Sequence, residues 1–356
     1  MVNKKLIIAI IIIIFLVGII GGNFIYQAES TSVNMDKINA GYITMSAGHA
    51  LIFIAKEKGF FEDQNLSVNV QEFTTGNDEL NALSSGKLDV AVDGVGEALI
   101  QMNHGKNFTF IGGVESGDHA VIAKNDEIAK ELQNDPNKYK NYKIGTVAGT
   151  PAEVITLGFL NNDYNIKKDQ LDIIEFKTAA DVVNGLKSDK IDVGLVYPAF
   201  QYQAEKEGLS IVNWTDELIP GLPDCRVTIN ADELTNETQD KWVRYMKSLI
   251  KAYDFYKSNH TETLEIVKKY VPLADDLLNI STYNDHLAIS TDPYEKGTQE
   301  IYDILTNIGY VDGSLDVSSH FNTTIYEIAL NEMLKEDPNN PNYLELKTTF
   351  DEQKLN

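Results

Sequence analysis

Leu83-Ser-Ser-Gly-Lys-Leu-Asp-Val-Ala-Val-Asp-Gly-Val-Gly-Glu-Ala98 is the stretch that decides how this chain folds. It predicts the end of a helix, a tight turn at Gly86, a strand over residues 88–92 and a glycine-containing loop before a new helix. Such a loop presents free backbone N–H groups and the positive end of a helix dipole. Because ligands of open α/β sheets bind at the carboxyl ends of strands, the stretch predicts one wall of a binding site.

A second copy of this unit runs from Leu186-Lys-Ser-Asp-Lys-Ile-Asp-Val-Gly-Leu195, with Asp192 in the position of Asp89. The apolar pattern before the first copy predicts alternating strands and helices, which is typical of a parallel sheet with helical crossovers. Two copies therefore predict two similar α/β lobes that face each other. We expect strands over residues 38–44, 66–73, 88–92, 107–114, 119–124, 143–147 and 226–230, and helices over 50–58, 78–85 and 199–207.

The remaining segments are assigned from their composition and helix signals. Thr150-Pro-Ala-Glu153 predicts a helix start with a capping box, whereas the Lys- and Asn-rich residues 125–141 read as a separator between lobes. Everything after residue 230 is expected to be helical, over 237–259, 262–271, 294–308 and 323–335. Residues 337–356 are polar and are expected to form a loosely held C-terminal tail.

Length, charge and cysteine content exclude several classes of protein. The 356 residues suffice for two α/β lobes with full cores, and the net charge of −23 argues against a nucleic-acid surface. The single cysteine, Cys225, excludes an intrachain disulfide and a cysteine-rich zinc site. We predict no cofactor, no metal and a monomeric protein.

The N-terminus carries an export or membrane signal. A short positively charged flank precedes an apolar run over residues 6–20, and the run extends to roughly the 20 residues that span a bilayer. Tyr26 stands where a cleavage site needs a small residue, so an uncleaved anchor is favoured over a cleaved signal peptide. We therefore predict an anchor or signal segment over residues 1–27, a linker over 28–37, and a protein on the outer face of the cytoplasmic membrane, or secreted if the segment is cleaved.

The order of motifs resembles the substrate-binding proteins of ABC importers, in the group that handles nitrate, sulfonates, taurine, bicarbonate and thiamine-pyrimidine precursors. The residues that carry the resemblance are His49-Ala50, Ala55-Lys-Glu-Lys-Gly-Phe-Phe61, Leu66-Ser-Val-Asn-Val70, Ala82-Leu-Ser-Ser-Gly-Lys-Leu-Asp89, Gly149-Thr150, Lys190-Ile-Asp192 and Pro223-Asp-Cys225. Two positions depart from the family pattern. Glu97 replaces a frequent proline, and Val196-Tyr197-Pro198 lacks the acidic residue of an aromatic-Glu-Pro triplet.

The resemblance implies an α/β, two-lobed, periplasmic-binding-protein-like fold of type II, the Venus flytrap, behind an N-terminal membrane helix. Lobe one would comprise residues 38–123 and 226–336, and lobe two residues 124–225. Closure of the hinge around a small polar or oxyanionic solute, such as a sulfonate, nitrate or taurine, is the expected motion. The implied partners are an ABC permease and its ATPase.

The candidate ligand-binding residues lie on the loops after the strands, where helix starts converge. Histidines could bind an anion, and tyrosines could form aromatic walls, whereas Asp93 could cap a helix or bind a donor group of the ligand. Arg226 suits a carboxylate or sulfonate but also a hinge salt bridge, and Cys225 reads as a buried structural residue. The set is Tyr42, Ser46, His49, Gly76, Asn77, Asp93, Gly94, Val95, His119, Thr150, Tyr197 and Arg226.

Other functional classes stay open. An enzyme on the same fold is disfavoured because the sequence has no Gly-x-Ser-x-Gly elbow, His-Glu-x-x-His helix or P-loop. The cysteine-rich motif of the pyrimidine-synthase relatives is also absent. The alternatives are a binder of a thiamine-pyrimidine-like precursor, an enzyme, or an extracellular sensor domain.

Overall fold

The computed structural model describes residues 35–355, and within them the part from Asp36 onward forms one compact unit. The predicted membrane segment at residues 1–27 lies outside the described residues, as does most of the linker. Among residues 35–355, no helix has the length and apolar character needed to cross a bilayer.

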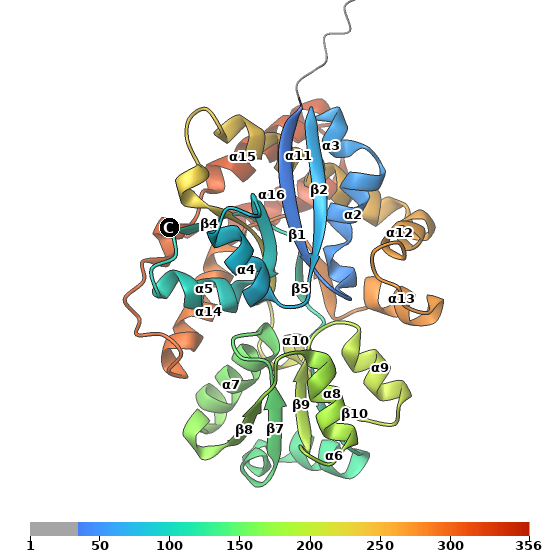
Figure 1. Ribbon diagram of the computed structural model, residues 1–356, viewed down its shortest axis with the longest axis vertical. Helices are drawn as coiled ribbons and strands as arrows, with labels where there is room; N and C mark the ends of the chain where they lie inside the picture. The colour runs from blue at the N-terminus through green and yellow to red at the C-terminus, as the bar shows by residue number, and fades with distance from the viewer. Residues whose placement is uncertain (1–34, 356) are drawn as a thin grey trace, which may run out of the picture. The chain divides into compact units, whose positions relative to one another are not determined.

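Two five-stranded sheets organise the chain (Figure 1). In the first sheet β1, β2 and β3 are parallel, and β11 runs antiparallel between β3 and β4. In the second sheet β7, β8 and β9 are parallel, and β6 runs antiparallel to β9 and β10. The first sheet is ordered β2 (Leu66–Phe73), β1 (Asp36–Ile43), β3 (Val90–Gly94), β11 (Cys225–Asn230), β4 (Phe108–Gly113); the second is ordered β10 (Ser210–Trp214), β6 (Ala120–Ala123), β9 (Val193–Val196), β7 (Lys143–Thr146), β8 (Asp172–Glu175).

The repeated unit predicted from the sequence is confirmed by matching hydrogen bonds in the two sheets. Asp89 accepts from the backbone N–H of Asn39 at 2.7 Å, and Asp192 accepts from that of Lys143 at 3.1 Å. Each aspartate thereby ties the turn before its strand to the neighbouring strand of its own sheet. The turns themselves need a left-handed residue, which is Gly86 in one copy and Asp189 in the other.

Helices cover both faces of each sheet, so four apolar clusters form the core. The cluster on one face of the first sheet includes α2, α11, α15 and α16, and the cluster on its other face includes α4, α5 and α14 together with side chains of α7. The helices are α2 (Ala50–Glu57), α3 (Phe60–Asp63), α4 (Gly76–Ser84), α5 (Val95–Asn103), α6 (Asp126–Asn134), α7 (Pro151–Tyr164), α8 (Ala179–Lys187), α9 (Phe200–Lys206), α10 (Thr215–Leu218), α11 (Gln239–Ser258), α12 (His260–Val267), α13 (Asp275–Thr282), α14 (Glu295–Asn307), α15 (Thr323–Glu336) and α16 (Pro341–Gln353).

Two chain segments connect the sheets. The outgoing segment passes from β4 through the short strand β5 (Glu115–Gly117), which pairs with β12 (Leu287–Ile289), and enters the second sheet at β6. Because Ala120–Ala123 belongs to the second sheet, the chain changes lobe before the expected boundary at residue 124. The return segment follows α10 and enters the first sheet at β11, close to the expected boundary at 225.

Two local expectations are wrong. Residues 125–141 do not separate the lobes, because they lie in the second lobe, where Asn125 caps α6 through the N–H of Ile128 and Leu132 is buried against the second sheet. The capping box at residues 150–153 does not form either. The Thr150 hydroxyl donates to the carbonyl of Val147 at 2.8 Å, and Glu153 accepts from the N–H of Gly149 instead.

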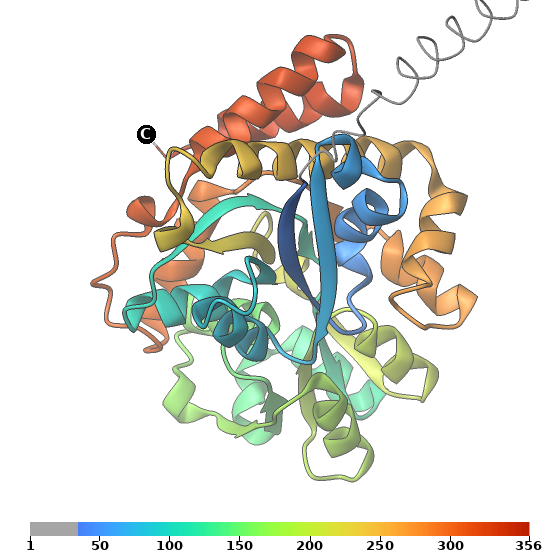
Figure 2. The same ribbon diagram turned by 45° about the horizontal axis from the view of Figure 1, so that its top comes forward.

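The polar tail predicted for residues 337–356 is also wrong, since α16 is an ordered helix. Asn340 caps it, and Tyr343, Leu346 and Phe350 are buried in the core of the first lobe. Phe350 meets Tyr326 of α15 edge to face at 5.1 Å. Figure 2 shows the C-terminal helices, in red, lying across the first lobe. Three buried side chains on one face of α16 are therefore enough to hold the helix on the core, although the segment is mostly polar.

Replacing Phe350 with alanine should therefore lower the free energy of unfolding by about 3–5 kcal/mol, because it leaves a cavity in this core. Leu344→Ala is the matched control, since Leu344 lies in the same helix with 47% of its surface exposed, and should change stability by less than about 0.5 kcal/mol. Urea unfolding followed by circular dichroism measures both. Equal effects would show that α16 does not pack as described.

Candidate ligand-binding site

A pocket of about 490 Å³, its mouth included, lies where the strand ends of the two sheets meet. Its lining comes from loops of both sheets and from the two connecting segments. The lining residues are Ile43, Ser46, His49, Thr75, Gly76, Gly94, Glu97, Glu115, His119, Val147, Thr150, Pro151, Tyr197, Pro198, Asp224 and Cys225.

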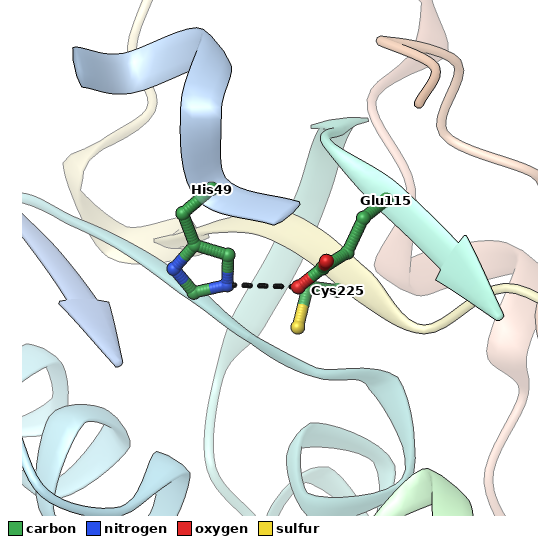
Figure 3. Close-up of side chains that lie close together, drawn as sticks. All are labelled: His49, Glu115 and Cys225. Carbon is green, nitrogen blue, oxygen red and sulfur yellow. Dashed lines mark ion pairs between the residues drawn. The ribbon is translucent and has the colours of Figure 1, made fainter. Parts of the chain in front are cut away.

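His49 and Glu115 form the inner wall of this pocket (Figure 3). The Nδ1 atom of His49 accepts from the N–H of Ile43 at 3.3 Å, so the ring proton sits on Nε2, which lies 3.2 Å from Oε1 of Glu115. Ser46 donates to the same Oε1 at 3.1 Å. Burial alone would raise the pKa of Glu115, but the contact with His49 outweighs it and holds the pKa below its usual value. Glu115 is therefore a buried carboxylate.

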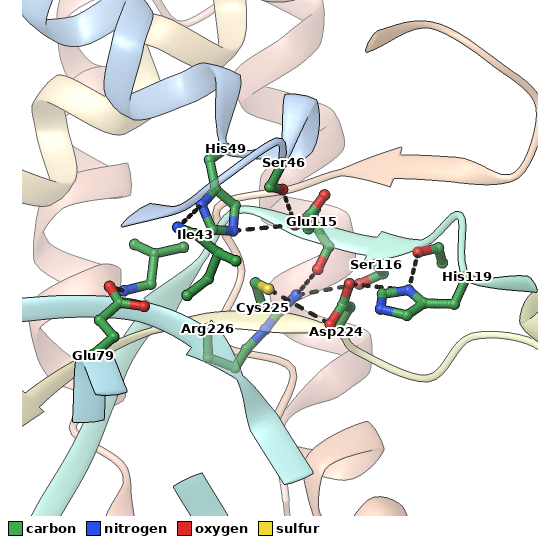
Figure 4. A network of polar contacts seen from close by, with 12 residues as sticks. Ile43, Ser46, His49, Glu79, Glu115, Ser116, His119, Asp224, Cys225 and Arg226 are labelled. Atoms are coloured by element: carbon green, nitrogen blue, oxygen red, sulfur yellow. Dashed lines mark hydrogen bonds and ion pairs between the residues drawn. The ribbon is translucent and has the colours of Figure 1, made fainter. Parts of the chain in front are cut away.

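His119 and Asp224 stand side by side on the two connecting segments (Figure 4). The Nδ1 atom of His119 lies 2.9 Å from the carbonyl of Gly117 and 3.3 Å from Oδ2 of Asp224, so the proton sits on Nδ1. Burial lowers the pKa of His119, which keeps the ring neutral and leaves Nε2 as an acceptor. Burial and the nearby Glu115 raise the pKa of Asp224.

Glu97 points at the first turn of α4. A Cβ atom at residue 76 would lie 2.4 Å from Oε2 of Glu97, so only glycine leaves room for this carboxyl group. The side chain of Asn77 donates to Oε1 at 3.3 Å. Burial raises the pKa of Glu97 to about 8, against the lowering effect of the nearby backbone of Asn77. The carboxyl group of Glu97 thus lies at the start of α4, a position that suits an anion.

His49, Glu115 and Cys225 are close enough for a metal, with candidate ligand atoms within 4.8 Å of one another. The orientation of His49 does not fit. A metal-binding histidine donates its second ring N–H to an acceptor, whereas Nδ1 of His49 faces the N–H of Ile43. Nε2 is therefore protonated and has no lone pair for a metal. Burial also raises the pKa of Cys225, which opposes formation of a thiolate ligand.

Seven of the predicted residues line the pocket. Thr150 follows β7 and Tyr197 follows β9 in the second sheet, whereas the others follow strands of the first sheet or lie in the outgoing segment. Loops at the carboxyl ends of parallel strands meet as the motifs predicted. The seven are Ser46, His49, Gly76, Gly94, His119, Thr150 and Tyr197.

The other five predicted residues do not line the pocket. Tyr42 packs edge to face on Phe53 at 5.0 Å, and Val95 belongs to the core between the first sheet and α5. Asp93 is fully buried beside Thr228, and Asn77 contacts Glu97 and Gln101 rather than the cavity.

Arg226 is the fifth, and its guanidinium points away from the pocket. It donates to the carbonyls of Asp292 and Glu115 and to the hydroxyl of Ser116, and it is fully buried. The expected hinge salt bridge is replaced by bonds to backbone carbonyls, which hold the two connecting segments together.

The sequence prediction did not include nine lining residues. Three of them carry carboxyl groups, and a fourth is the cysteine that had been read as structural. Glu115 and Asp224 lie just before the strands predicted over residues 119–124 and 226–230, and that position was the one available signal. The nine are Ile43, Thr75, Glu97, Glu115, Val147, Pro151, Pro198, Asp224 and Cys225.

Comparison with known proteins shows one family. The family described as NMT1/THI5 like matches residues 46–263, more than half of the chain. A candidate aliphatic sulfonates-binding protein of Bacillus subtilis is 24% identical over 342 residues, covering 92% of this chain and 98% of that protein. A candidate binding protein of Brucella abortus is 24% identical over 247 residues, covering 69% and 74%.

A 4-amino-5-hydroxymethyl-2-methylpyrimidine phosphate synthase of Saccharomyces cerevisiae is also related, with 23% identity over 252 residues, covering 67% of this chain and 71% of the yeast protein.

Solved structures share the fold. The zinc-bound ligand-binding component of an ABC-type import system from Staphylococcus aureus has a TM-score of 0.71 and 17% identity, covering 83% of this chain and 99% of that chain. The periplasmic nitrate-binding protein of Synechocystis has a TM-score of 0.69 and 15% identity, covering 90% and 99%.

The raised pKa of Glu97 predicts a pH dependence of stability. Between about pH 4.5 and pH 8 the folded protein holds a proton that the unfolded chain releases, so stability falls as pH rises. Glu97→Gln removes this contribution, which is at most about 1.4 kcal/mol per pH unit. Urea unfolding at pH 5.5 and 7.5 should show a smaller loss for Glu97→Gln than for wild type.

The exposed Glu300 supplies the control, because Glu300→Gln makes the same chemical change at the surface of α14 and should keep the wild-type slope. A Glu97→Gln variant with an unchanged slope would contradict the assignment of the raised pKa.

Proposed function

Since this chain belongs to the NMT1/THI5-like family, we propose that it is the extracytoplasmic substrate-binding component of an ABC importer. It captures a small polar solute between its lobes and delivers the solute to a membrane permease and its ATPase. The names of related binding proteins support this role. The predicted segment over residues 1–27 would tether it to the outer face of the cytoplasmic membrane.

Loops of both lobes line the same pocket, and this is the main support for the proposal. Ser46 and Gly94 come from loops of the first sheet, whereas Thr150 and Tyr197 come from loops of the second, so one ligand can contact both lobes at once. A solute that touches both lobes favours the closed arrangement, because its contacts are complete only there.

Contacts between the lobes support closure as well. Tyr310, which follows α14 in the first lobe, donates to Oε2 of Glu153 in α7 at 2.7 Å. Lys168 of the second lobe donates to the hydroxyl of Tyr310 at 2.7 Å. Glu153 also accepts from the N–H of Gly149, beside the lining residue Thr150. The interlobe contact therefore reaches a loop of the pocket.

Two classes of solute follow from the relatives. A sulfonate-, nitrate- or taurine-like oxyanion matches the names of the binding proteins, and a pyrimidine matches the name of the yeast synthases. The lining carboxyl groups of Glu97, Glu115 and Asp224 weigh against an oxyanion.

We favour binding over synthase activity, because the cysteine-rich motif of the pyrimidine-synthase relatives is absent from the sequence. Mass spectrometry of a solute incubated with the protein should recover it chemically unchanged. Conversion of the solute would support the enzymatic alternative.

A screen for thermal stabilisation tests the binding role. The panel contains taurine, methanesulfonate, nitrate, bicarbonate, 4-amino-5-hydroxymethyl-2-methylpyrimidine, acetamidine and guanidine. At least one solute should raise Tm by several degrees, since a ligand at a hundred times its Kd adds about 2.7 kcal/mol. The same solute should reduce the radius of gyration in small-angle X-ray scattering.

Tyr197→Ala should weaken the stabilisation, because Tyr197 lines the pocket, whereas Tyr164→Ala, at an exposed position of α7, should not. A protein that no solute stabilises or compacts would contradict the proposed function.

A further inference from the structure

We propose that the pocket selects a small organic cation with several N–H donors, of the amidinium or guanidinium class, and that Glu97 is the residue that turns the site away from oxyanions. This inference rests on the proposed function, because it names the class of solute held between the lobes.

The lining is rich in acceptors. Glu97, Glu115 and Asp224 are at least nine-tenths buried, and each contributes a carboxyl group to the same cavity. Among residues 35–355, no lysine or arginine lines the pocket. The nearest guanidinium, that of Arg226, is committed to carbonyls behind the wall. Because Glu115 is an ionised carboxylate in this lining, a bound oxyanion would meet like charge without a compensating cation.

An unpartnered buried oxygen points independently to a missing donor. Oε1 of Glu115 contacts Ser46 and His49, but Oε2 has no hydrogen-bond partner among the described residues, and Glu115 is 1% exposed. Leaving a buried carboxylate oxygen unpaired is costly, so a ligand N–H that reaches it gains this missing bond. The absence of a side chain at Gly48 makes room for that oxygen, since a Cβ atom there would overlap it.

Glu97 explains why the site differs from one built for an oxyanion. The start of α4 offers unpaired N–H groups, which suit a negatively charged ligand. Here the carboxyl group of Glu97 already accepts from the side chain of Asn77 and lies against Gly76 in the first turn of that helix. The protein supplies its own acid at this helix start, so an external oxyanion would have to displace the Glu97 carboxyl group to bind there.

The geometry suits a planar nitrogen cation. Amidinium and guanidinium groups present parallel N–H donors that pair with a carboxylate in a bidentate way. The neutral His119 adds an acceptor at Nε2, and the ring of Tyr197 adds a surface that attracts cations.

Isothermal titration calorimetry with acetamidine hydrochloride and with sodium methanesulfonate tests the proposal. Wild type should bind acetamidinium and not methanesulfonate, and Glu97→Gln should weaken acetamidinium binding at least tenfold. Glu97→Ser removes the internal acid and should gain methanesulfonate binding. The exposed control, Glu300→Gln, should bind both probes as wild type does.

The pH profile separates the two ligand classes. A cation pairs with ionised Glu97, so its affinity should rise between pH 6 and pH 8, by up to tenfold per pH unit. An anion that uses protonated Glu97 as a donor would show the opposite trend. Binding of methanesulfonate by wild type, or unchanged acetamidinium binding by Glu97→Gln, would overturn the proposal.

Two further results would show whether the cation proposal fails alone or together with the proposed function. Binding of zinc chloride without binding of acetamidinium would also overturn the proposal, since it would assign the acceptors to a metal. If an oxyanion compacts the wild-type protein in small-angle scattering, the inference fails while the proposed function stands. If Glu97→Gln does not fold, the wild-type comparison alone decides.

Discussion

The buried guanidinium of Arg226 is the contact that joins the two segments connecting the lobes. It bonds to the carbonyl of Glu115 on the outgoing segment and to that of Asp292, while its own backbone belongs to the returning strand β11. Residue 113 must be glycine for this approach, because a Cβ atom there would lie 2.3 Å from a guanidinium nitrogen. With its backbone held, Glu115 turns its side chain between Ser46 and His49 into the cavity. One arginine thus joins the hinge to the binding wall.

This constraint gives the family fold a distinct electrostatic character. The fold places helix starts around a cleft, which suits oxyanions, and related proteins carry sulfonate and nitrate in their names. In this chain the cleft also holds Glu97, Glu115 and Asp224, and Glu97 lies against the start of α4. The scaffold and the side chains therefore favour ligands of opposite charge. A charge interacts more strongly with a nearby ligand when little water screens it. The buried carboxyl groups therefore decide whether the cleft prefers a cation or an anion.

Much of the scaffold could be predicted from the sequence, because period and turn chemistry are local. The turn at Gly86 and its copy at Asp189 fix where strands begin, and the loops that follow converge by topology. Residues inside those loops were harder. Tyr42 and Val95 follow the same pattern as lining residues but face the core, which depends on packing between distant elements. Glu115 and Asp224 reach the cavity through the chain crossing, a contact that no local pattern encodes.

We propose, then, a two-lobed receptor that closes on a nitrogen cation held by its own carboxyl groups. The most direct measurement is a crystal structure of the protein with the molecule that it retains from its expression host, identified by mass spectrometry. We expect a solute whose N–H groups lie within about 3.2 Å of the carboxyl oxygens of Glu115 and Glu97. A sulfonate, nitrate or other oxyanion bound at the start of α4, with Glu97 displaced from it, would contradict the account.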